Sequence, residues 1–370
     1  MHLFSMKRVA VAAMAVAGFC ATGVAGAAGQ DGWTIPQCKS ISGAPNITMT
    51  KNEGAKLAKT SGQMAQYSYA FGLVPLGEQN TMLAAVGSKI LRSTDAGCNW
   101  QPLADLTGDT GNALLLLEAA GSDRAYGWAV NGNALATIAG DAASSTWVPG
   151  SGMTGFSVAP GHPKQLRFGD SSGTIWASRD GGKTWAVSGG LSGYFVYRTA
   201  FDPKNPDHIL VGTMSNGAFT SFDGGLSWQP ASGFALKGIS VNIFNVVVSP
   251  ANPDIVWAQG INLAEADANV PSQGRHVYRS GDGGRSFSPV VDQDSRVTLT
   301  NGPLMVPHPT NEQVLYFVFG MSFMQYGTDL YRYDQDTRAV TLTHNSYSEI
   351  SAIAFHPKRP ELMYLGLAND

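Results

Sequence analysis

One short pattern recurs four times along the chain and limits the possible folds more than any other feature. It reads Ser-x-Asp-x-Gly-x-x-Trp, with Phe in place of Trp in the last copy, and occupies residues 93–100, 178–185, 221–228 and 280–287. The aspartate can accept hydrogen bonds from backbone N–H groups where a hairpin reverses, and glycine supplies the positive φ. The aromatic residue begins the next strand and covers the hairpin with its apolar face. We call this pattern the Asp turn and expect a purely structural role for Asp95, Gly97, Trp100, Asp180, Gly182, Trp185, Asp223, Gly225, Trp228, Asp282, Gly284 and Phe287.

A second pattern, an apolar strand that ends in a proline turn, alternates with the first. It occurs at residues 159–163, 202–206, 249–253, 308–311 and 356–360. A short apolar run, a glycine-bearing turn, another strand and an Asp turn follow in order. One unit therefore contains four strands in about 40–50 residues, which is the period of propeller blades.

The repeat predicts an all-β fold, a seven-bladed β-propeller of four-stranded antiparallel blades. Six units cover residues 65–103, 113–149, 153–188, 194–231, 240–290 and 298–341, and a seventh begins at Ser348. The second unit has lost the Asp turn, and we interpret Trp147 as its retained tryptophan.

The chain stops before the seventh unit has all its strands. Residues 31–35 near the N-terminus look like the tail of an Asp turn. We therefore expect the N-terminal segment to complete the last blade and close the ring, which removes open sheet edges. The alternative is a sequence truncated at its C-terminus.

The composition agrees with many short strands joined by tight turns. Only 14% of the 370 residues are charged, 44 are glycine and 10% are aromatic. These values exclude a disordered chain, a coiled coil, a collagen and a multispanning membrane protein. The net charge of −3 shows no basic footprint for nucleic acid.

The N-terminal residues have the pattern of a secretory signal peptide. Lys7 and Arg8 precede an apolar run at residues 9–19, and an Ala-x-Ala site ends at Ala27. We expect residues 1–27 to be removed and residues 28–370 to form a single propeller domain, secreted or periplasmic, with no membrane span in the mature chain. A buried N-terminal helix is the alternative.

Cleavage would leave two cysteines, Cys38 and Cys98. In an exported chain we expect these to pair in a disulfide rather than to bind a metal or act as a nucleophile. Closing that loop would stabilise the fold by roughly 3–4 kcal/mol.

The Asp turns resemble the Asp-box, or bacterial neuraminidase repeat. That repeat occurs in sialidases, xyloglucanase-type glycoside hydrolases, sortilin-type receptors and exported propellers similar to photosystem II assembly factors. Because enzymes and non-enzymes share it, the resemblance implies the fold but not an activity. It also implies that ligands meet the face opposite the Asp turns and the central channel.

Catalytic signatures are weak in this sequence. A sialidase-like site needs three arginines around a carboxylate, and Arg198, Arg275 and Arg296 could in principle reach one site. A xyloglucanase-like site needs paired carboxylates and usually two propellers, whereas this chain has room for one. Residues 169–173 match Gly-x-Ser-x-Gly, but flanking strands predict a hairpin rather than a nucleophile elbow.

We expect no cofactor and no metal. The sequence contains no His-x-x-x-His or Cys-x-x-Cys spacing. Glu265 and Asp267 are spaced like calcium ligands, but their loop lacks the glycine that lets a calcium loop turn. A solvated acidic loop is the simpler interpretation.

The connections opposite the Asp turns carry the candidate ligand-binding residues. Exposed aromatic and methionine side chains with acidic residues at the rim suit a protein or peptide surface, although aromatic platforms also suit sugars. A plain gap-filling role between blades is the alternative. The candidates are Tyr194, Arg198, Asn242, Glu265, Asp267, Arg275, Asp292, Asp294, Arg296, Met321, Phe323, Tyr326, Tyr347 and Glu349.

The sequence thus predicts an exported, monomeric, non-enzymatic binding or assembly module for a protein or peptide partner. The alternative is a carbohydrate-active glycoside hydrolase of the sialidase or xyloglucanase type, with a glycan as ligand.

Overall fold

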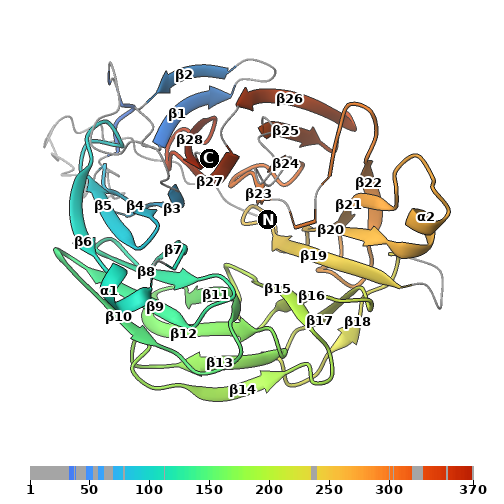
Figure 1. The fold of residues 1–370 in the computed structure, drawn as a ribbon, viewed down its shortest axis with the longest axis horizontal. Coiled ribbons are helices and arrows are strands. Elements are labelled where there is room, and N and C mark those ends of the chain that lie inside the picture. Colours follow the sequence, from blue (N-terminus) through green and yellow to red (C-terminus); the bar gives the residue numbers. More distant parts are fainter. Residues whose placement is uncertain are drawn as a thin grey trace, which may run out of the picture. The chain divides into compact units, whose positions relative to one another are not determined.

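The computed structural model describes residues 33–36, 38, 47–52, 57–61, 70–77, 80–111, 113–234, 240–299, 301–302, 304–318, 328–346 and 349–368. Residues 32–370 form one compact unit. In the described part of this unit, seven four-stranded sheets surround a common centre (Figure 1). Neighbouring strands in every sheet are antiparallel. This arrangement confirms the predicted seven-bladed, all-β architecture.

Each of the first six blades is built from four consecutive strands, ordered from the centre outward. The strands of these blades are β3 (Ala70–Pro75), β4 (Met82–Val86), β5 (Lys89–Ser93) and β6 (Gln101–Asp105); β7 (Leu115–Ala119), β8 (Arg124–Ala129), β9 (Ala134–Ala139) and β10 (Ala142–Trp147); β11 (Met153–Ala159), β12 (His162–Asp170), β13 (Thr174–Ser178) and β14 (Ala186–Gly190); β15 (Val196–Phe201), β16 (Ile209–Thr213), β17 (Ala218–Ser221) and β18 (Gln229–Pro230); β19 (Val241–Val248), β20 (Val256–Asn262), β21 (Arg275–Ser280) and β22 (Ser288–Asp292); β23 (Met305–Pro307), β24 (Val314–Val318), β25 (Thr328–Asp334) and β26 (Ala339–Ser346).

The seventh sheet combines strands from both ends of the chain. Strands β27 (Glu349–Phe355) and β28 (Leu362–Ala368) lie inside β1 (Ile47–Asn52) and β2 (Leu57–Ser61). Strand β28 pairs with β1, with Tyr364 opposite Met49. Residues 33–36, within the segment that resembles the tail of an Asp turn, form no strand.

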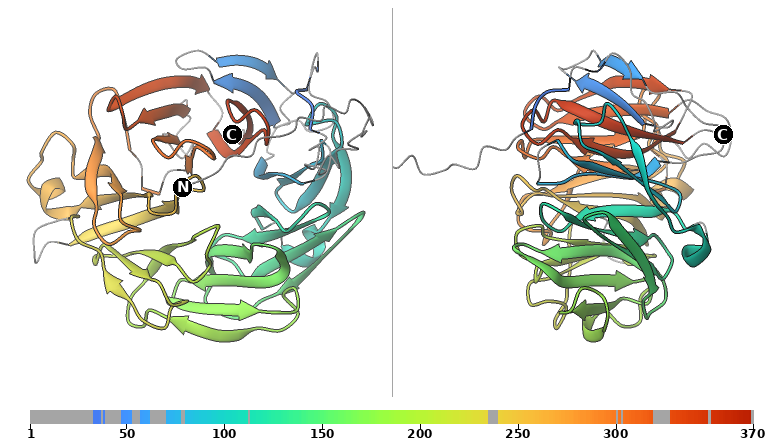
Figure 2. Two further views of the ribbon diagram at one scale, coloured as in Figure 1. Left: turned by 180° about the vertical axis from the view of Figure 1, so that it is seen from behind. Right: turned by 90° about the vertical axis from the view of Figure 1, so that its left-hand side faces the viewer.

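Helices play a minor part in the described chain. Helix α1 (Thr107–Thr110) follows blade one, and α2 (Leu263–Asp267) lies in the loop between β20 and β21. Neither is long enough to cross a membrane, and the described residues contain no helix that could. Figure 2 shows the ring from behind and from the side.

The Asp turns have the hydrogen bonds that their residue types predict. In all four, the serine hydroxyl donates to the aspartate and accepts the N–H of the glycine four positions later at 2.9 Å. The Ser227 hydroxyl and backbone N–H both donate to Asp223 and lower the pKa of its carboxyl to about 2. These carboxylates are satisfied by the turn itself, which fits a structural role.

Blade two departs from the pattern. The expectation that Trp147 is the retained tryptophan of an Asp turn is wrong, because this residue ends β10 and its side chain is 68% exposed. Trp100, in contrast, is buried and donates its indole N–H to the Gly97 carbonyl at 2.9 Å. Residues 169–173 form the predicted hairpin between β12 and β13, where buried Asp170 accepts hydrogen bonds from its own turn.

The hydrophobic core lies between adjacent blades, and glycines bring some blades very close. Thr199 of β15 sits in a notch formed by Gly155 of β11 and Gly169 of β12. A Cβ on Gly155 would stand 1.9 Å from the Thr199 carbonyl oxygen. The Thr199 hydroxyl also lies 2.8 Å from the Thr154 hydroxyl. The missing side chains therefore set the spacing between blades three and four.

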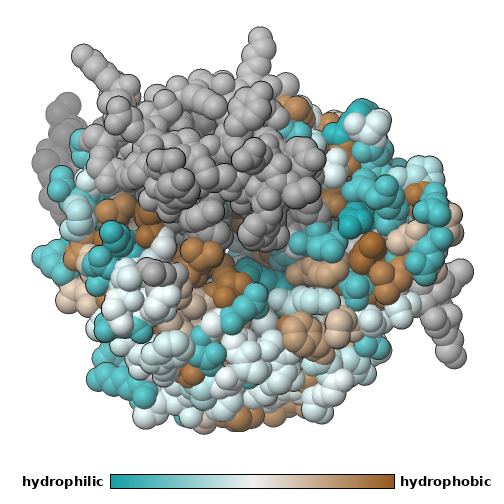
Figure 3. Space-filling view, viewed as in Figure 1, coloured by the Kyte–Doolittle hydropathy of each residue, from teal (hydrophilic) through white to brown (hydrophobic). Residues whose placement is uncertain are grey.

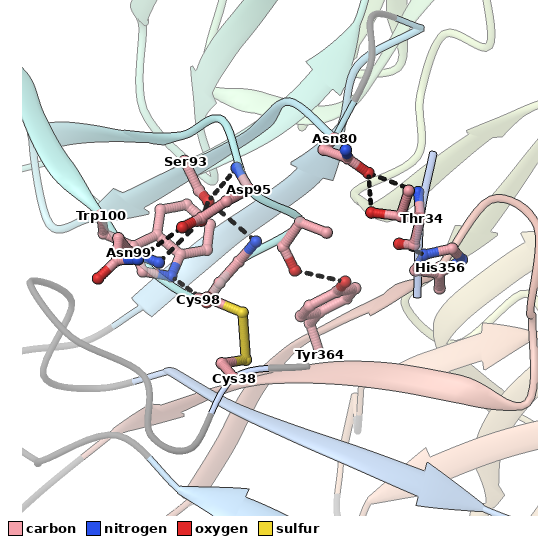
Figure 4. The surroundings of a disulfide bond; sticks show 12 residues. Thr34, Cys38, Asn80, Ser93, Asp95, Cys98, Asn99, Trp100, His356 and Tyr364 are labelled. Carbon is pink, nitrogen blue, oxygen red and sulfur yellow. Dashed lines mark hydrogen bonds between the residues drawn. A yellow bond between two sulfur atoms is a disulfide. The ribbon is translucent and has the colours of Figure 1, made fainter. Parts of the chain in front are cut away.

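The first and seventh blades are tied together near the first Asp turn. A disulfide joins Cys38 to Cys98, with 5.3 Å between Cα atoms, which confirms the predicted pairing (Figure 4). The Tyr364 hydroxyl of β28 donates to the Ala96 carbonyl in that turn at 2.7 Å. His356 contacts the Thr34 carbonyl through Nε2 at 2.9 Å. Residues far apart in sequence thus converge on one corner of the ring.

Candidate functional site

The two faces of the ring are distinguished by the connections that they carry. Asp turns join the third strand of a blade to the fourth, so they lie at one end of the sheets. The hairpins between second and third strands, and the connections between blades, lie at the other end, which we call the loop face. In Figure 3 this face shows apolar residues beside the middle of the ring, next to hydrophilic ones.

The structure places the described candidate residues in three different settings. Tyr194, Asn242, Glu265, Asp267, Arg275, Asp292, Asp294 and Arg296 belong to connections or strand ends of the loop face. Arg198 lies within the inner strand β15. Met321, Phe323, Tyr326 and Tyr347 lie outside the described residues, and only the backbone of Glu349 is described.

An aromatic cluster occupies the inner rim of the loop face. Phe195 and Tyr197 have ring centroids 5.3 Å apart, and Tyr197 and Phe244 are 4.9 Å apart. We define these three residues as the aromatic cluster. Phe195 is 48% exposed, and its carbonyl accepts the N–H of Met214, which is 45% exposed. The cluster therefore offers an apolar, partly exposed surface shared by blades four and five.

Two β-bulges orient this cluster. The pairing of β15 with β16 skips Tyr197, and the pairing of β19 with β20 skips Phe244. A bulge leaves its extra residue unpaired and re-aims the side chain. Sequence reasoning missed these residues because a bulge leaves no pattern in the sequence.

A cavity of about 310 Å³ lies at the centre of the ring, lined by the inner strands of all seven blades. Its described lining residues are mostly apolar and include only two charged side chains, Glu118 of β7 and Arg198 of β15. The Arg198 guanidinium carbon stands 5.4 Å from the centroid of the Trp128 ring. Glu118, which sequence reasoning missed, is thus the only described carboxylate in the cavity.

The environment of the cavity shifts the pKa values of both Glu118 and Arg198. Glu118 is exposed to the space of the cavity, but protein surrounds that space. Desolvation raises the pKa of Glu118 to about 7, opposed by the positive charge of Arg198. Desolvation also lowers the pKa of Arg198 to about 10, a value at which it stays charged at neutral pH. Neither side chain makes a hydrogen bond or ion pair with a residue in the described part of the chain.

A second pocket, of about 550 Å³, lies beside α2 in blade five. Buried His276 bridges two carboxylates, with Nε2 2.8 Å from Glu265 and Nδ1 2.7 Å from Asp292. Asn262 caps α2 and donates to Glu265 at 2.8 Å. These contacts hold the predicted acidic loop against the blade. Among the described residues, no group of acidic, histidine or cysteine side chains is arranged to hold a metal ion.

The remaining candidates do not assemble into one site. Of the three arginines considered for a carboxylate clamp, only Arg198 lines the central cavity. Arg296 is 84% exposed at its side chain and pairs with Asp294 at 2.9 Å. Asn242 accepts the backbone N–H of Ser215 at 2.7 Å, a contact that fastens a neighbouring hairpin. The three-arginine arrangement expected of a sialidase-like site is therefore not formed.

Comparisons with known proteins agree with the fold. No family model matches the chain. Among solved structures, the glycoside hydrolase GH74 of Niastella koreensis superposes with a TM-score of 0.58 at 16% identity, over 86% of this chain and 52% of that one. YCF48 bound to D1 peptide superposes with a TM-score of 0.55 at 11% identity, over 91% of this chain and all of that one. The chain spans about half the length of the GH74 enzymes that it matches.

A sequence relative is much closer. The dispase autolysis-inducing protein of Streptomyces mobaraensis is 43% identical over 340 residues, which cover 91% of this chain and 90% of the relative. Identity of this extent along nearly the whole of both chains establishes common membership. The chain belongs to the family of the dispase autolysis-inducing protein.

Proposed function

We propose that this protein is an exported, non-enzymatic binding module that engages a protein partner through the loop face. The observation that carries the proposal is the aromatic cluster, in which two bulges place Tyr197 and Phe244 beside Phe195, the residue before β15. Partly exposed aromatic side chains on a rigid frame are typical of the anchors that dominate protein interfaces.

The partner that we propose is an exported protease. The name of the 43% identical relative states that it induces the autolysis of dispase, an effect on a self-cleaving enzyme. One neighbour in fold is described as bound to a peptide. The name of the relative favours a protein ligand over a glycan, and the fold neighbour adds only that a propeller of this fold can bind a peptide.

The central cavity gives little support to the alternative, a glycoside hydrolase. Hydrolysis of a glycoside by the usual mechanism needs two carboxyl groups that flank the scissile bond. Glu118 is the only carboxylate among the described residues of the cavity. The fold shared with GH74 enzymes does not supply a function by itself.

The proposal includes three features of the precursor and the ring. A signal peptide ends near Ala27, the four Asp turns are Asp-box repeats, and the mature protein acts as a monomer. The pairing of β1 with β28 supports a ring closed by the N-terminal segment, because it gives blade seven its third and fourth strands.

The test is binding of purified dispase, measured by biolayer interferometry, together with the rate at which dispase fragments appear on gels. Phe195→Ala and Tyr197→Ala should each weaken binding at least tenfold and slow fragmentation. Leu226→Ala is the matched control, because Leu226 is 76% exposed but lies in an Asp turn on the other face.

The proposal fails if Leu226→Ala weakens binding as much as the cluster variants, or if dispase does not bind. Release of a chromophore from sialosides or β-glucans, abolished by Glu118→Gln, would establish the hydrolase instead.

A further inference from the structure

The central cavity contains two opposite charges that the described protein leaves without partners. Glu118 comes from blade two and Arg198 from blade four, and both line the same space. Each influences the pKa of the other, yet no ion pair joins them. An unpaired charge in a partly desolvated site is unfavourable unless another group compensates it.

The position of Arg198 leaves its hydrogen-bonding capacity free. Its guanidinium carbon lies 5.4 Å from the Trp128 ring centroid, and Trp128 is buried and stacks on Phe156 at 6.4 Å. The cation–π contact fixes the guanidinium without using its N–H donors. Those donors form a planar fork that matches a carboxylate.

The size and lining of the cavity limit what can enter. About 310 Å³ is near the lower end of the range for small-molecule sites. Apart from the two charges, the described lining consists of apolar side chains, glycines, serine and threonine, including Val246, Val248 and Ser351. A fitting ligand is therefore small and carries opposite charges at its two ends.

We propose that the central cavity binds a small zwitterion of the amino acid or dipeptide class, with its carboxylate on Arg198 and its ammonium group on Glu118. This site is separate from the aromatic cluster and does not depend on protein binding at the loop face. The raised pKa of Glu118 adds a consequence for pH. Because Glu118 and Arg198 are the only titratable side chains in the described lining, an ammonium group should bind more weakly at pH 5.5 than at pH 7.5.

The experiment is isothermal titration of the mature protein with the dipeptide Ala-Ala at pH 7.5. N-acetyl-Ala-Ala lacks the ammonium group, and Ala-Ala-amide lacks the carboxylate. We expect each blocked dipeptide to bind about tenfold or more weakly than Ala-Ala, because each loses a charge-assisted contact.

Variants assign each end of the ligand to its residue. Glu118→Gln should weaken Ala-Ala binding about tenfold and leave the affinity for N-acetyl-Ala-Ala unchanged. Arg198→Gln should weaken Ala-Ala binding about tenfold and leave the affinity for Ala-Ala-amide unchanged. Asp123→Asn and Arg179→Gln remove exposed charges outside the cavity and should change nothing. Circular dichroism and melting curves verify that each variant folds.

Three results would overturn the inference. One is the absence of heat from Ala-Ala at concentrations up to tens of millimolar. Another is equal binding of the blocked dipeptides by the wild-type protein. The third is unchanged binding in folded Glu118→Gln and Arg198→Gln proteins.

Discussion

Replacing Gly155 by alanine should force blades three and four apart. The new Cβ would stand 1.9 Å from the Thr199 carbonyl oxygen and 2.7 Å from the carbonyl carbon, about 1.5 Å closer to the oxygen than the 3.4 Å at which ordinary contact begins. The obstacle is backbone, so no side-chain rotation relieves it. Overpacking of a tight core costs typically 1–3 kcal/mol, and we expect about 3 kcal/mol here because both strands are hydrogen-bonded in their own sheets.

Intrinsic β-propensity alone predicts that Gly155→Ala stabilises the protein rather than destabilising it. Alanine inside a strand is normally better than glycine by roughly 0.5–1 kcal/mol. Urea unfolding followed by tryptophan fluorescence measures the difference between the two proteins. Gly281→Ala is the control, because a Cβ there meets only the Arg279 side chain at 3.9 Å and the backbone φ is not positive. If Gly155→Ala unfolds at the same urea concentration as Gly281→Ala, the close approach of the two blades is refuted.

Three further predictions address the turns, the disulfide and the cavity. Ser280→Ala should lower the free energy of unfolding by about 1–3 kcal/mol, because the N–H of Gly284 loses its buried acceptor; urea unfolding that matches wild type would contradict this. Replacing Cys38 by serine should lower the free energy of unfolding by about 4 kcal/mol, because the disulfide no longer restricts the unfolded chain across a sequence separation of 60 residues. If a reducing agent left the melting temperature of the wild-type protein unchanged, this prediction would be wrong. Desolvation within the central cavity raises the pKa of Glu118 in the folded state to about 7, so the unfolded chain releases this proton first and the free energy of unfolding falls as the pH rises from about 4.5 to 7. The melting temperature of Glu118→Gln should not show that decline between pH 4.5 and 8. If the variant and the wild-type protein showed the same pH dependence, the decline would not come from Glu118.

The blade boundaries could be read from the sequence because they depend on local chemistry. An aspartate, a glycine and a tryptophan within eight residues define a hairpin without any distant partner, and the fourth strand follows directly. Blade two lacks this pattern, and it is the blade in which the interpretation of Trp147 fails. Local signals therefore predict most of the repeat, and the assignment of Trp147 fails in a blade without an Asp turn.

Long-range pairing was predictable only in outline. The short C-terminal blade indicated that the N-terminal segment must contribute, but residues 47–61 contain no turn signature that marks them as its outer strands. Trp33 lies in the segment that resembles an Asp turn, but its side chain packs between blades one and seven, and residues 33–36 enter no sheet. Only the pairing of β1 with β28 in the structure identifies residues 47–61 as the outer strands of blade seven.

The candidate sites depend on three-dimensional placement to a greater degree. The sequence offers Arg198 as one of three arginines that could share a site, but the neighbours of Arg198 in the structure, Trp128 and Glu118, come from a blade two positions away. A lone glutamate in an apolar strand gives no reason to suspect a cavity. Tyr197 and Phe244 look like ordinary strand residues until the register shift is known.

The pairing of Met49 with Tyr364 affects the order in which the sheets can form during folding. Strand β1, the first strand of the described residues, is separated from β28 by more than 300 residues, which must be synthesised before the two strands can pair. Until then β1 and β2 are an isolated hairpin, which has little stability in water. A polypeptide interrupted before β28 would keep the other six sheets but would leave the β1–β2 hairpin without its neighbouring strand, and such exposed strand edges promote aggregation.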